Sequence, residues 1–464
     1  MSLKRCCGVG FLLLLSSLLA HAQRGAAATT LAPAQPSVPA GATAVAGFRA
    51  DLATDAWLAT VPARDKARSD AYFEGGYWLL FWDFLWNAAV LLLIVLSGFS
   101  AKMRGFATRL SRFRPLQDAL YWIQYCVVSA IAMFPALCYE AFFRERQYGL
   151  MNQSFSSWMR DQAVAFVALI VPAGLLFLPL LMALVRRFPR SWHIWMTAAA
   201  TLIGIFVTAI FPVYVVPLFN TSKPLEDLRL KDQILSLARA NGIPATDVYE
   251  VNASRQSKRV SANVSGFAGT ERITLNDNLL RRVSPAGVLS TMGHEMGHYV
   301  LHHIVNGILF GLIVSAAVLT TLRACLYWLL RRWGERWGIA GPRDVAVLPV
   351  ALLVLSIWNL LFTPIGNTFT RTQEYEADLY GLNAARQPDG EAEVDLLLGE
   401  YRKLSPTRLE EFIFFDHPSG RTRIYAAMRW KQENLCLFNA ALACSNPPEA
   451  LTGAPSPPIQ QNGR

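Results

Sequence analysis

The stretch HEMGHYVLHH, residues 294–303, decides the interpretation of this chain, because it places four of the seven histidines directly before a long apolar run. His294 and His298 are four residues apart, so on a helix both imidazoles project from one face and can bind one metal ion. Glu295 stands next to the first histidine, where its carboxylate can reach a water at the metal without binding the metal. The pattern predicts a zinc hydrolase with Glu295 as the general base.

The other two histidines of this stretch are expected to have a different role. His302 lies two turns beyond His294, about 12 Å along a helix axis, which is too far to share a metal ion with it. His303 is expected to face away, so both are interpreted as surface or packing histidines. A metzincin is excluded, because Leu301 and Ile304 occupy the positions of its glycine and third histidine. The alternative to a metal site is a pair of histidines that are hydrogen-bonded on a buried helix face.

A third metal ligand has to come from another segment, and TRTQEYEADLYGLNAA, residues 370–385, carries suitable side chains. Glu374 and Asp378 are four residues apart on a predicted helix. One carboxylate can therefore bind zinc while the other orients a histidine through its second ring nitrogen. A solvated acidic helix face is the alternative interpretation of Glu374.

The composition indicates a membrane protein, since 53% of the residues are apolar, only 16% are charged and 13 are tryptophans. A helix needs roughly 20 apolar residues to cross the hydrocarbon core of a bilayer. Six stretches meet this requirement, namely residues 76–101, 120–142, 162–185, 194–219, 304–330 and 345–366.

The last two of these stretches connect the metal ligands to the membrane. The helix of His298 is expected to run on into the span that starts near Ile304, and the span that ends near Phe362 leads to Glu374. A hairpin of two membrane helices thus brings both ligand segments to one face of the bilayer. The zinc is expected just outside the hydrocarbon.

The net charge of +10 is not gathered in one patch, and no nucleic-acid partner is expected. The basic residues instead occupy three short loops between spans, which is typical of cytoplasmic loops. These residues are Lys102, Arg104, Arg109, Arg112 and Arg114, then Arg186, Arg187 and Arg190, then Arg331, Arg332 and Arg336.

The amino-terminal residues 1–22 combine two basic residues, a short apolar core and small residues at the end, which predicts a secretory signal peptide. An uncleaved first membrane span is the alternative. In both cases the number of spans that follow places the basic loops inside the cytoplasm and the residues around His294 outside it.

Outside the spans, KPLEDLRLKDQILSLARANG is expected to form an amphipathic helix that ends at Asn241-Gly242. DVYEVNAS and GTERITLND are expected to be strands of a small sheet, with SANVSGFAG between them. Ser284 is expected to cap the metal-binding helix ahead of Pro285. Cys436 and Cys444 either form a disulfide in an extracytoplasmic domain or are two unrelated thiols.

The chain resembles the family of integral-membrane zinc endopeptidases that contains the type I CAAX prenyl proteases and a bacterial heat-shock membrane protease. The resemblance rests on FFRERQYGL, VYVVPLFNTSKPLEDLRLK, VYEVNASRQSKRVSANVSGFAGTERITLNDNLL, HEMGHYVLHH, NTFTRTQEYEADLYG and FDHPSGRTRI. It implies a mostly α membrane protein, in which a zincin-like α+β metalloprotease domain is inserted into a multi-helix transmembrane bundle.

The resemblance also implies roles for individual residues. His294, His298 and Glu374 correspond to the zinc ligands, Glu295 to the general base, and Asp378 to a carboxylate that supports a ligand.

The resemblance extends to residues that would meet the substrate. His417, which by itself would be a histidine of a surface loop, is expected to face the substrate or the reaction intermediate, with Arg423 nearby to orient it or to balance charge. The substrate backbone is expected to add to an edge strand at Ser261, Ala262 and Asn263, where the family shows Asn-Ala.

The expected organisation follows the chain from a signal peptide to a disordered tail. It comprises a signal peptide (1–22), a linker and amphipathic lead-in (23–75), four transmembrane helices (76–219), a first protease segment (220–303), a transmembrane hairpin (304–366), a second protease segment (367–446) and a tail (447–464).

These observations predict a membrane-embedded zinc metalloendopeptidase, similar to CAAX prenyl protease 1, that takes Zn2+ and cleaves membrane-associated or CAAX-type peptides at the bilayer. The expected location is a bacterial inner membrane with the protease domain in the periplasm. There, quality control of misfolded membrane or exported proteins is an alternative function. A second alternative is a non-enzymatic membrane scaffold on a protease fold.

Overall fold

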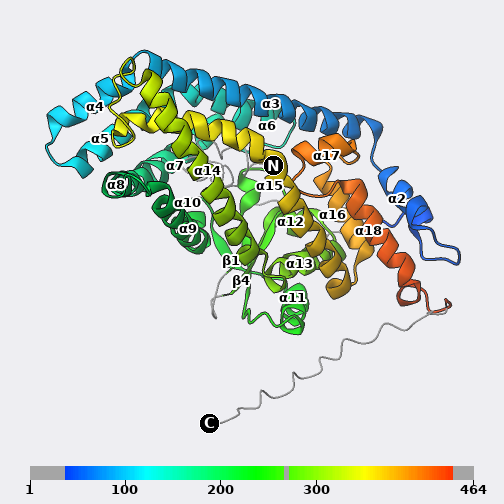
Figure 1. Cartoon of the computed structure of the whole chain (residues 1–464). Coiled ribbons are helices and arrows are strands. Elements are labelled where there is room, and N and C mark those ends of the chain that lie inside the picture. The colour runs from blue at the N-terminus through cyan, green and yellow to red at the C-terminus, as the bar shows by residue number, and fades with distance from the viewer. Residues whose placement is uncertain (1–36, 266–270, 443–464) are drawn as a thin grey trace, which may run out of the picture.

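The computed structural model describes residues 37–265 and 271–442. Figure 1 shows long helices in the upper left and centre, a small sheet with shorter helices at the lower centre, and the carboxy-terminal helices to the right. The expected signal peptide (1–22), Cys444 and the expected tail (447–464) lie outside the described residues.

Within the described residues, six helical segments are long and apolar enough to cross a membrane, as the sequence predicts. Two of them contain short π-helical turns next to regular helix, and a third is followed by one. The segments are α3 (Ala63–Leu96); α5 (Arg114–Cys138) with η3 (Tyr139–Arg144) and α6 (Glu145–Gln147); α7 (Phe155–Ala165) with η4 (Phe166–Ile170) and α8 (Val171–Arg187); α9 (Trp192–Ile210), which η5 (Phe211–Val215) and α10 (Val216–Phe219) follow; α14 (His303–Trp333); and η7 (Val345–Val347) with α15 (Leu348–Ala385).

The helix bounds differ from the sequence prediction at both ends of the first span. α3 begins at Ala63 rather than at residue 76, and it ends at Leu96 because Gly98 adopts a left-handed conformation with φ of 66°. A separate helix, α4 (Phe99–Leu110), carries the basic residues that follow. The first span is therefore longer on its protease side than hydropathy alone indicated.

The membrane helices pack through small residues. Gly174 of α8 lies against Trp122 of α5, so closely that an added Cβ would come within 1.9 Å of the indole. The indole nitrogen of Trp122 donates a hydrogen bond to the carbonyl oxygen of Val171 at 3.2 Å. Such close approach through glycine is typical of helix contacts in membranes, where dispersion and hydrogen bonds replace the hydrophobic effect.

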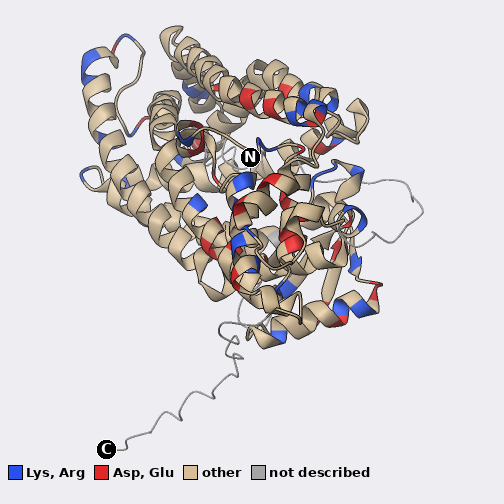
Figure 2. Ribbon diagram, turned by 90° about the vertical axis from the view of Figure 1, so that its right-hand side faces the viewer, with Lys and Arg blue, Asp and Glu red and all other residues tan. Residues whose placement is uncertain are grey.

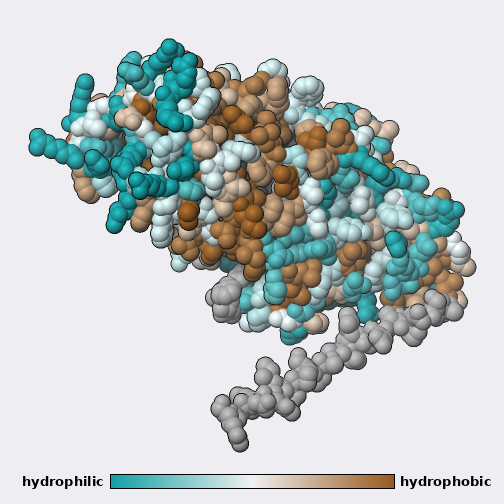
Figure 3. Space-filling view, in the orientation of Figure 1, coloured by the Kyte–Doolittle hydropathy of each residue, from teal (hydrophilic) through white to brown (hydrophobic). Residues whose placement is uncertain are grey.

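The three basic loops meet at one end of the bundle. Arg186 forms a bidentate ion pair with Asp118 at 2.6 and 2.7 Å, and Arg104 of α4 pairs with Asp344 in the loop that follows α14. Figure 2 shows long uncharged stretches of helix between charged ends. Figure 3 shows a hydrophobic band between this hydrophilic end and the part of the molecule that carries the sheet. The basic loops and the sheet thus lie on opposite sides of the apolar band.

The sheet has four strands in the order β1-β2-β4-β3. They are β1 (Ser222–Pro224), β2 (Val248–Val251), β3 (Ala262–Ser265) and β4 (Arg272–Asn276). β2 and β4 are parallel, and β3 is an antiparallel edge strand in which Ala262 lies opposite Leu275. Sequence patterning predicted the two central strands, whereas β3 lies in the segment between them.

The sheet packs on α11 (Leu228–Ala240), α12 (Asp277–Arg282) and α13 (Pro285–Val300). α11 ends as predicted, with Gly242 in the left-handed region at φ of 70°. Ile273 and Leu275 of β4 are fully buried beside Met292 and Met296 of α13. This core fixes the metal-binding helix on the sheet.

The carboxy-terminal helices are α16 (Pro388–Leu398), α17 (Arg408–Phe414) and α18 (Gly420–Glu433). Part of the segment predicted as a linker packs on them: η2 (Ala40–Ala42) and α2 (Ala50–Leu58) share a core with α18. Ala53 is fully buried, and the backbone nitrogen of Ala50 donates to Gln432 at 2.7 Å. Residues 40–42, which belong to the expected linker, are thus packed on the protease domain, and small alanines allow α2 to lie close to α18.

Candidate metal centre

The helix α13 positions the two histidines of the HEMGH motif. It begins as predicted, because the Ser284 side chain accepts a hydrogen bond from the backbone nitrogen of Gly287 at 3.2 Å. His294 and His298 lie one turn apart on the same face, and their Nε2 atoms are 3.1 Å from each other. The motif therefore presents two ring nitrogens to one point in space.

Glu374 reaches the same point from α15. Its Oε2 atom lies 3.3 Å from His294 Nε2 and 3.8 Å from His298 Nε2. The three ligand atoms that these residues offer all lie within 4.8 Å of one another. Sequence reasoning linked Glu374 to the histidines through a membrane hairpin, and the structure brings the three residues together.

A close helix crossing produces this arrangement. On α13, Gly293 and Gly297 lie against α15, where an added Cβ would come within 3.0 Å and 3.2 Å of the carbonyl oxygens of Gly381 and Ala377. A Cβ on Gly381 would lie only 2.7 Å from the backbone nitrogen of His294. Without these glycines the two helices could not approach closely enough for Glu374 to meet both histidines.

The residues present fit a zinc ion. Zinc binds histidine nitrogen and carboxylate oxygen at about 2.0–2.2 Å in tetrahedral sites, which places neighbouring ligand atoms roughly 3.3 Å apart. The observed separations of 3.1, 3.3 and 3.8 Å are close to that value. His294 Nδ1 lies 2.7 Å from Asp378 Oδ1, and a proton shared there leaves Nε2 free to bind a metal.

Arg423 of α18 lies behind the site and contacts carboxylates. Its guanidinium is 2.8 Å from Asp378, 3.1 Å from Asp395 and 3.2 Å from Glu391, and the four side chains are almost completely buried. Burial alone lowers the pKa of Arg423, but these three carboxylates raise it well above the usual value. Arg423 therefore holds Asp378 against His294, and its position fits the expected balancing of charge rather than contact with a substrate.

Glu295, the expected general base, is half-buried on α13 next to His294. Burial raises the pKa of its carboxyl group, and the nearby His294 and His298 oppose this change. A carboxylate with a raised pKa is a better proton acceptor than an exposed glutamate.

His417 is brought to the site from a loop between α17 and α18. Its Nε2 atom lies 3.2 Å from Glu374 Oε2, and its Nδ1 atom lies 2.9 Å from Asp416 Oδ1. Burial and the nearby Arg402 lower the pKa of His417. Arg371 fixes the loop by donating to the carbonyl oxygen of Phe415 at 2.7 Å.

His303 is the site residue that sequence reasoning missed. Its Nδ1 atom lies 2.8 Å from His298 Nδ1, and the side chain is buried. The expectation that it faces away assumed one continuous helix. The helix instead breaks, because His302 adopts a left-handed conformation with φ of 56° between α13 and α14. The expectation that His303 faces away is wrong for this reason, although the side chain is packed in the interior, and His302 is exposed.

Ser261, Ala262 and Asn263 lie at and just before the start of the edge strand β3. The backbone nitrogen of Asn276 donates to the carbonyl oxygen of Ser261 at 2.9 Å, so β4 occupies one side of this segment. Ser261 and Asn263 are exposed. Within the described residues, no further strand pairs with the other side of β3.

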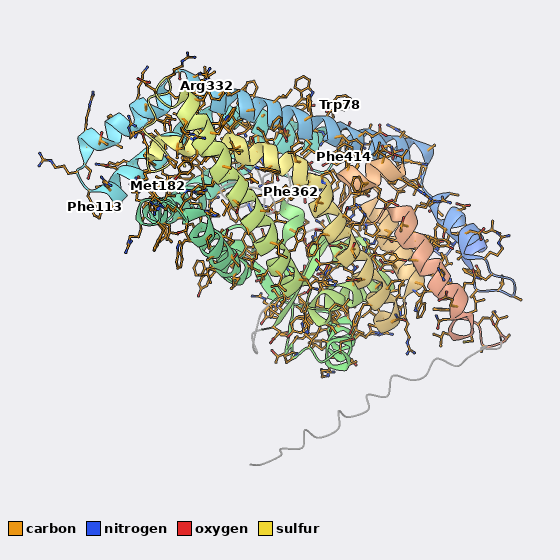
Figure 4. All side chains as sticks on the ribbon, in the orientation of Figure 1. Trp78, Phe113, Met182, Arg332, Phe362 and Phe414 are labelled. Carbon is orange, nitrogen blue, oxygen red and sulfur yellow. The ribbon has the colours of Figure 1, made fainter. Side chains whose placement is uncertain are left out.

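An apolar cavity of about 720 Å³ lies among the membrane helices and extends towards the metal centre. Its lining includes Met182 of α8 and Phe362 of α15, both labelled in Figure 4. It also includes Phe369 and Gln373, the latter directly before Glu374 in the chain. The bundle thus contains an apolar space whose wall continues into the helix that carries Glu374.

Comparisons with known proteins match both halves of the chain. Residues 224–431 match the model of peptidase family M48, and residues 55–221 match that of the CAAX prenyl protease N-terminal region with five membrane helices. The crystal structure of Ste24p from S. mikatae has the same fold, with a TM-score of 0.68 over 92% of this chain and 98% of that chain at 19% identity.

Two relatives show how far the sequence similarity extends. The chain is 29% identical to a Bacillus subtilis protein named uncharacterized metalloprotease YhfN, over 74% of this chain and 80% of that protein. It is 24% identical to CAAX prenyl protease 1 of Saccharomyces cerevisiae, over 64% of this chain and 69% of that protein. Taken with the six membrane helices and the His-His-Glu site, these matches show that the chain belongs to peptidase family M48 as an integral-membrane zinc metalloprotease.

Proposed function

We propose that His294, His298 and Glu374 bind the zinc ion and that Glu295 is the general base for peptide-bond hydrolysis. The observation that carries this proposal is the meeting of three ligand atoms within 4.8 Å of one another, next to a glutamate whose pKa burial raises. When bound, zinc supplies a Lewis acid that activates water for attack on a peptide carbonyl.

The side chains of this chain perform the proton and binding steps. Glu295 accepts a proton from the attacking water and returns it to the leaving amide nitrogen. His417, with a proton on Nε2, donates a hydrogen bond to oxygen at the reacting centre, and its 3.2 Å distance from Glu374 supports that position. The free edge of β3 at Ser261, Ala262 and Asn263 binds the peptide backbone in an extended form.

The proposed substrates are peptides held in or at the membrane, including CAAX-type peptides. The apolar cavity supports this class, because its wall reaches Gln373, next to the proposed ligand Glu374. The yeast relative is named CAAX prenyl protease 1, which supports testing a prenylated carboxy-terminal peptide.

The proposed location is a bacterial inner membrane with the metal centre in the periplasm. The basic loops lie on the opposite side of the apolar band from the sheet, which supports an extracytoplasmic site by the distribution of positive charge. This orientation favours quality control of misfolded membrane or exported proteins as the alternative function.

The decisive experiment compares the purified full-length protein with its Glu295→Gln variant in lipid vesicles. Wild type is expected to hold one zinc per chain and to cleave a membrane-anchored peptide. The variant is expected to keep its zinc and to lose about 10²–10⁴-fold in turnover, because a positioned base contributes that much. Full turnover by the variant would contradict the role of Glu295.

A substrate panel then separates the candidate functions. Faster cleavage of a prenylated peptide than of its unprenylated counterpart supports a CAAX-type activity, whereas cleavage only of unfolded membrane proteins supports quality control. One zinc per chain with no cleavage of any substrate would favour a non-enzymatic scaffold.

A further inference from the structure

The two histidines of the metal site are supported in different ways by the residues behind them. His294 Nδ1 faces the carboxylate of Asp378 at 2.7 Å, and Arg423 holds that carboxylate. His298 Nδ1 faces another imidazole, that of His303, at 2.8 Å, and among the residues that the structure describes no carboxylate forms a hydrogen bond with it. The second arrangement is the unusual one.

The position of His303 depends on the break between α13 and α14. In a continuous helix His303 would be rotated by about 140° from His298, because five residues correspond to about 500° of rotation. α13 ends at Val300, the left-handed His302 redirects the chain, and α14 begins at His303. The rings of His298 and His303 then lie 5.0 Å apart between centroids at an interplanar angle of 72°.

The chemistry of two facing Nδ1 atoms assigns the tautomers. If His298 binds a metal through Nε2 as a neutral ring, its proton is on Nδ1, so His298 donates and His303 Nδ1 accepts. His303 then carries its own proton on Nε2. That atom is buried and lies 3.3 Å from Glu376 Oε2 without a well-aligned hydrogen bond.

Glu376 can complete this arrangement, because its side chain is 54% exposed and free to rotate. Residue spacing alone predicts no role for Glu376. The side chain of Gln373 also contacts this segment, since its Nε2 atom lies 3.4 Å from the carbonyl oxygen of His303. α15 therefore contributes Glu374 to one side of His298 and Glu376 to the far side of His303.

We propose that His303 is a positioning residue that holds His298 in its metal-binding tautomer and orientation, with Glu376 as the outer member of the chain His298–His303–Glu376. This inference rests on the proposed metal site. A residue that fixes a ligand histidine through its second nitrogen typically contributes 10–100-fold to metal affinity. Unlike the carboxylate at His294, the neutral imidazole adds no negative charge next to its ligand.

The test measures zinc release to a chelator from full-length protein in detergent, for wild type and for His303→Ala, His303→Leu and His303→Asn. Alanine and leucine are expected to weaken zinc binding by about 10–100-fold. Asparagine is expected to restore most of it, because its side-chain oxygen occupies the place of Nδ1 as an acceptor. Asn306→Ala, an exposed change one turn further along α14, is the matched control and should behave like wild type.

Two further readouts distinguish positioning from a general structural role. The absorption spectrum of the Co2+-substituted protein should change in His303→Leu and recover in His303→Asn, whereas the melting temperature of the metal-free protein should differ little among the variants. Glu376→Gln should produce a smaller change in zinc release than His303→Ala, because Glu376 is one step further from the metal.

The inference is overturned if His303→Leu keeps zinc as long as wild type does, or if His303→Asn is no better than His303→Leu. It is also overturned if wild type holds no zinc, in which case the proposed function fails with it. If wild type holds one zinc and the His303 series behaves as expected, but no peptide is cleaved, only the proposed function fails.

Discussion

The two helices that carry the proposed metal ligands leave the membrane in different ways. α15 is assigned as one helix from Leu348 to Ala385, with Pro364 inside it, so one element contains both a membrane span and the Glu374-Asp378 pair. The other junction breaks at His302, where α13 and α14 meet at an angle. The comparison shows that a continuous helix fixes a ligand relative to the membrane, whereas a break allows a second histidine to turn back and support the first.

The largest expected effect on stability comes from the buried charge cluster around Arg423, which holds Asp378 of the continuous helix α15. Arg423→Met leaves the carboxylates of Asp378, Glu391 and Asp395 without their shared cation. We expect a loss of about 3–5 kcal/mol in the free energy of unfolding, because breaking a buried ion pair leaves an uncompensated charge. Denaturant unfolding in detergent measures this loss.

Arg421→Met is the control, because Arg421 lies on α18 together with Arg423. Arg421 pairs with Asp55 at 2.7 Å, but the two side chains are 50% and 57% exposed. We expect a change of about 0–1 kcal/mol for such a surface pair. Equal effects of the two variants would contradict the role of the buried cluster.

The second-largest effect is expected at the glycine contact between the continuous helix α15 and α13, the helix that ends before the break at His302. Gly381→Ala places a Cβ 2.7 Å from the backbone nitrogen of His294 and pushes α13 away from α15. We expect a cost of about 1–3 kcal/mol from overpacking, together with weaker zinc binding. Thermal unfolding and zinc titration measure both effects.

Gly366→Ala provides the matched control, because Gly366 lies on the same helix and a Cβ there meets nothing within 4 Å. We expect this variant to be as stable as wild type or more stable by up to about 1 kcal/mol, since alanine favours helix. Unchanged zinc affinity in Gly381→Ala would show that the close crossing is not what sets the ligand geometry.

The smallest effect is expected at the break itself. His302 has φ of 56°, a conformation that histidine tolerates better than β-branched residues do. We expect His302→Val to cost about 1–2 kcal/mol and to speed zinc release by moving His303, while His302→Gly stays close to wild type.

Arg386, with φ of 55°, marks the end of α15 and gives a control for strain alone. Arg386→Val should destabilise the fold by a similar amount without changing zinc release, because it lies beyond the ligand pair. If both valine variants release zinc equally fast, the break at His302 has no special connection to the metal centre.

Much of the metal centre was predictable because its residues follow local spacing. His294 and His298 share a helix face whenever that segment is helical, and Glu374 and Asp378 do the same. The six spans were predictable because crossing a bilayer requires long apolar stretches. Their bounds were less so, since π-helical turns extend two of them and Gly98 ends another.

The contributions of His303 and His417 were not predictable from spacing. No sequence signal marks His302 as left-handed, although histidine is among the residues that tolerate this conformation. His417 would be an ordinary loop histidine, and only contacts such as Arg371 with the carbonyl oxygen of Phe415 bring it to Glu374. The packing of α2 on α18 was missed because alanine-rich segments also resemble linkers.

The sequence by itself determined the membrane class, the side chains able to bind zinc and the resemblance to a family of membrane proteases. These features depend on residue type and on periodicity along one element. The tertiary structure alone decided which distant side chains meet: the glycine crossing of α13 and α15, the support of His294 by Asp378 and Arg423, and the return of His303 to His298. The physical reason is that these contacts depend on how closely two backbones approach and on the direction of each helix. Residues that are far apart in the chain jointly determine both.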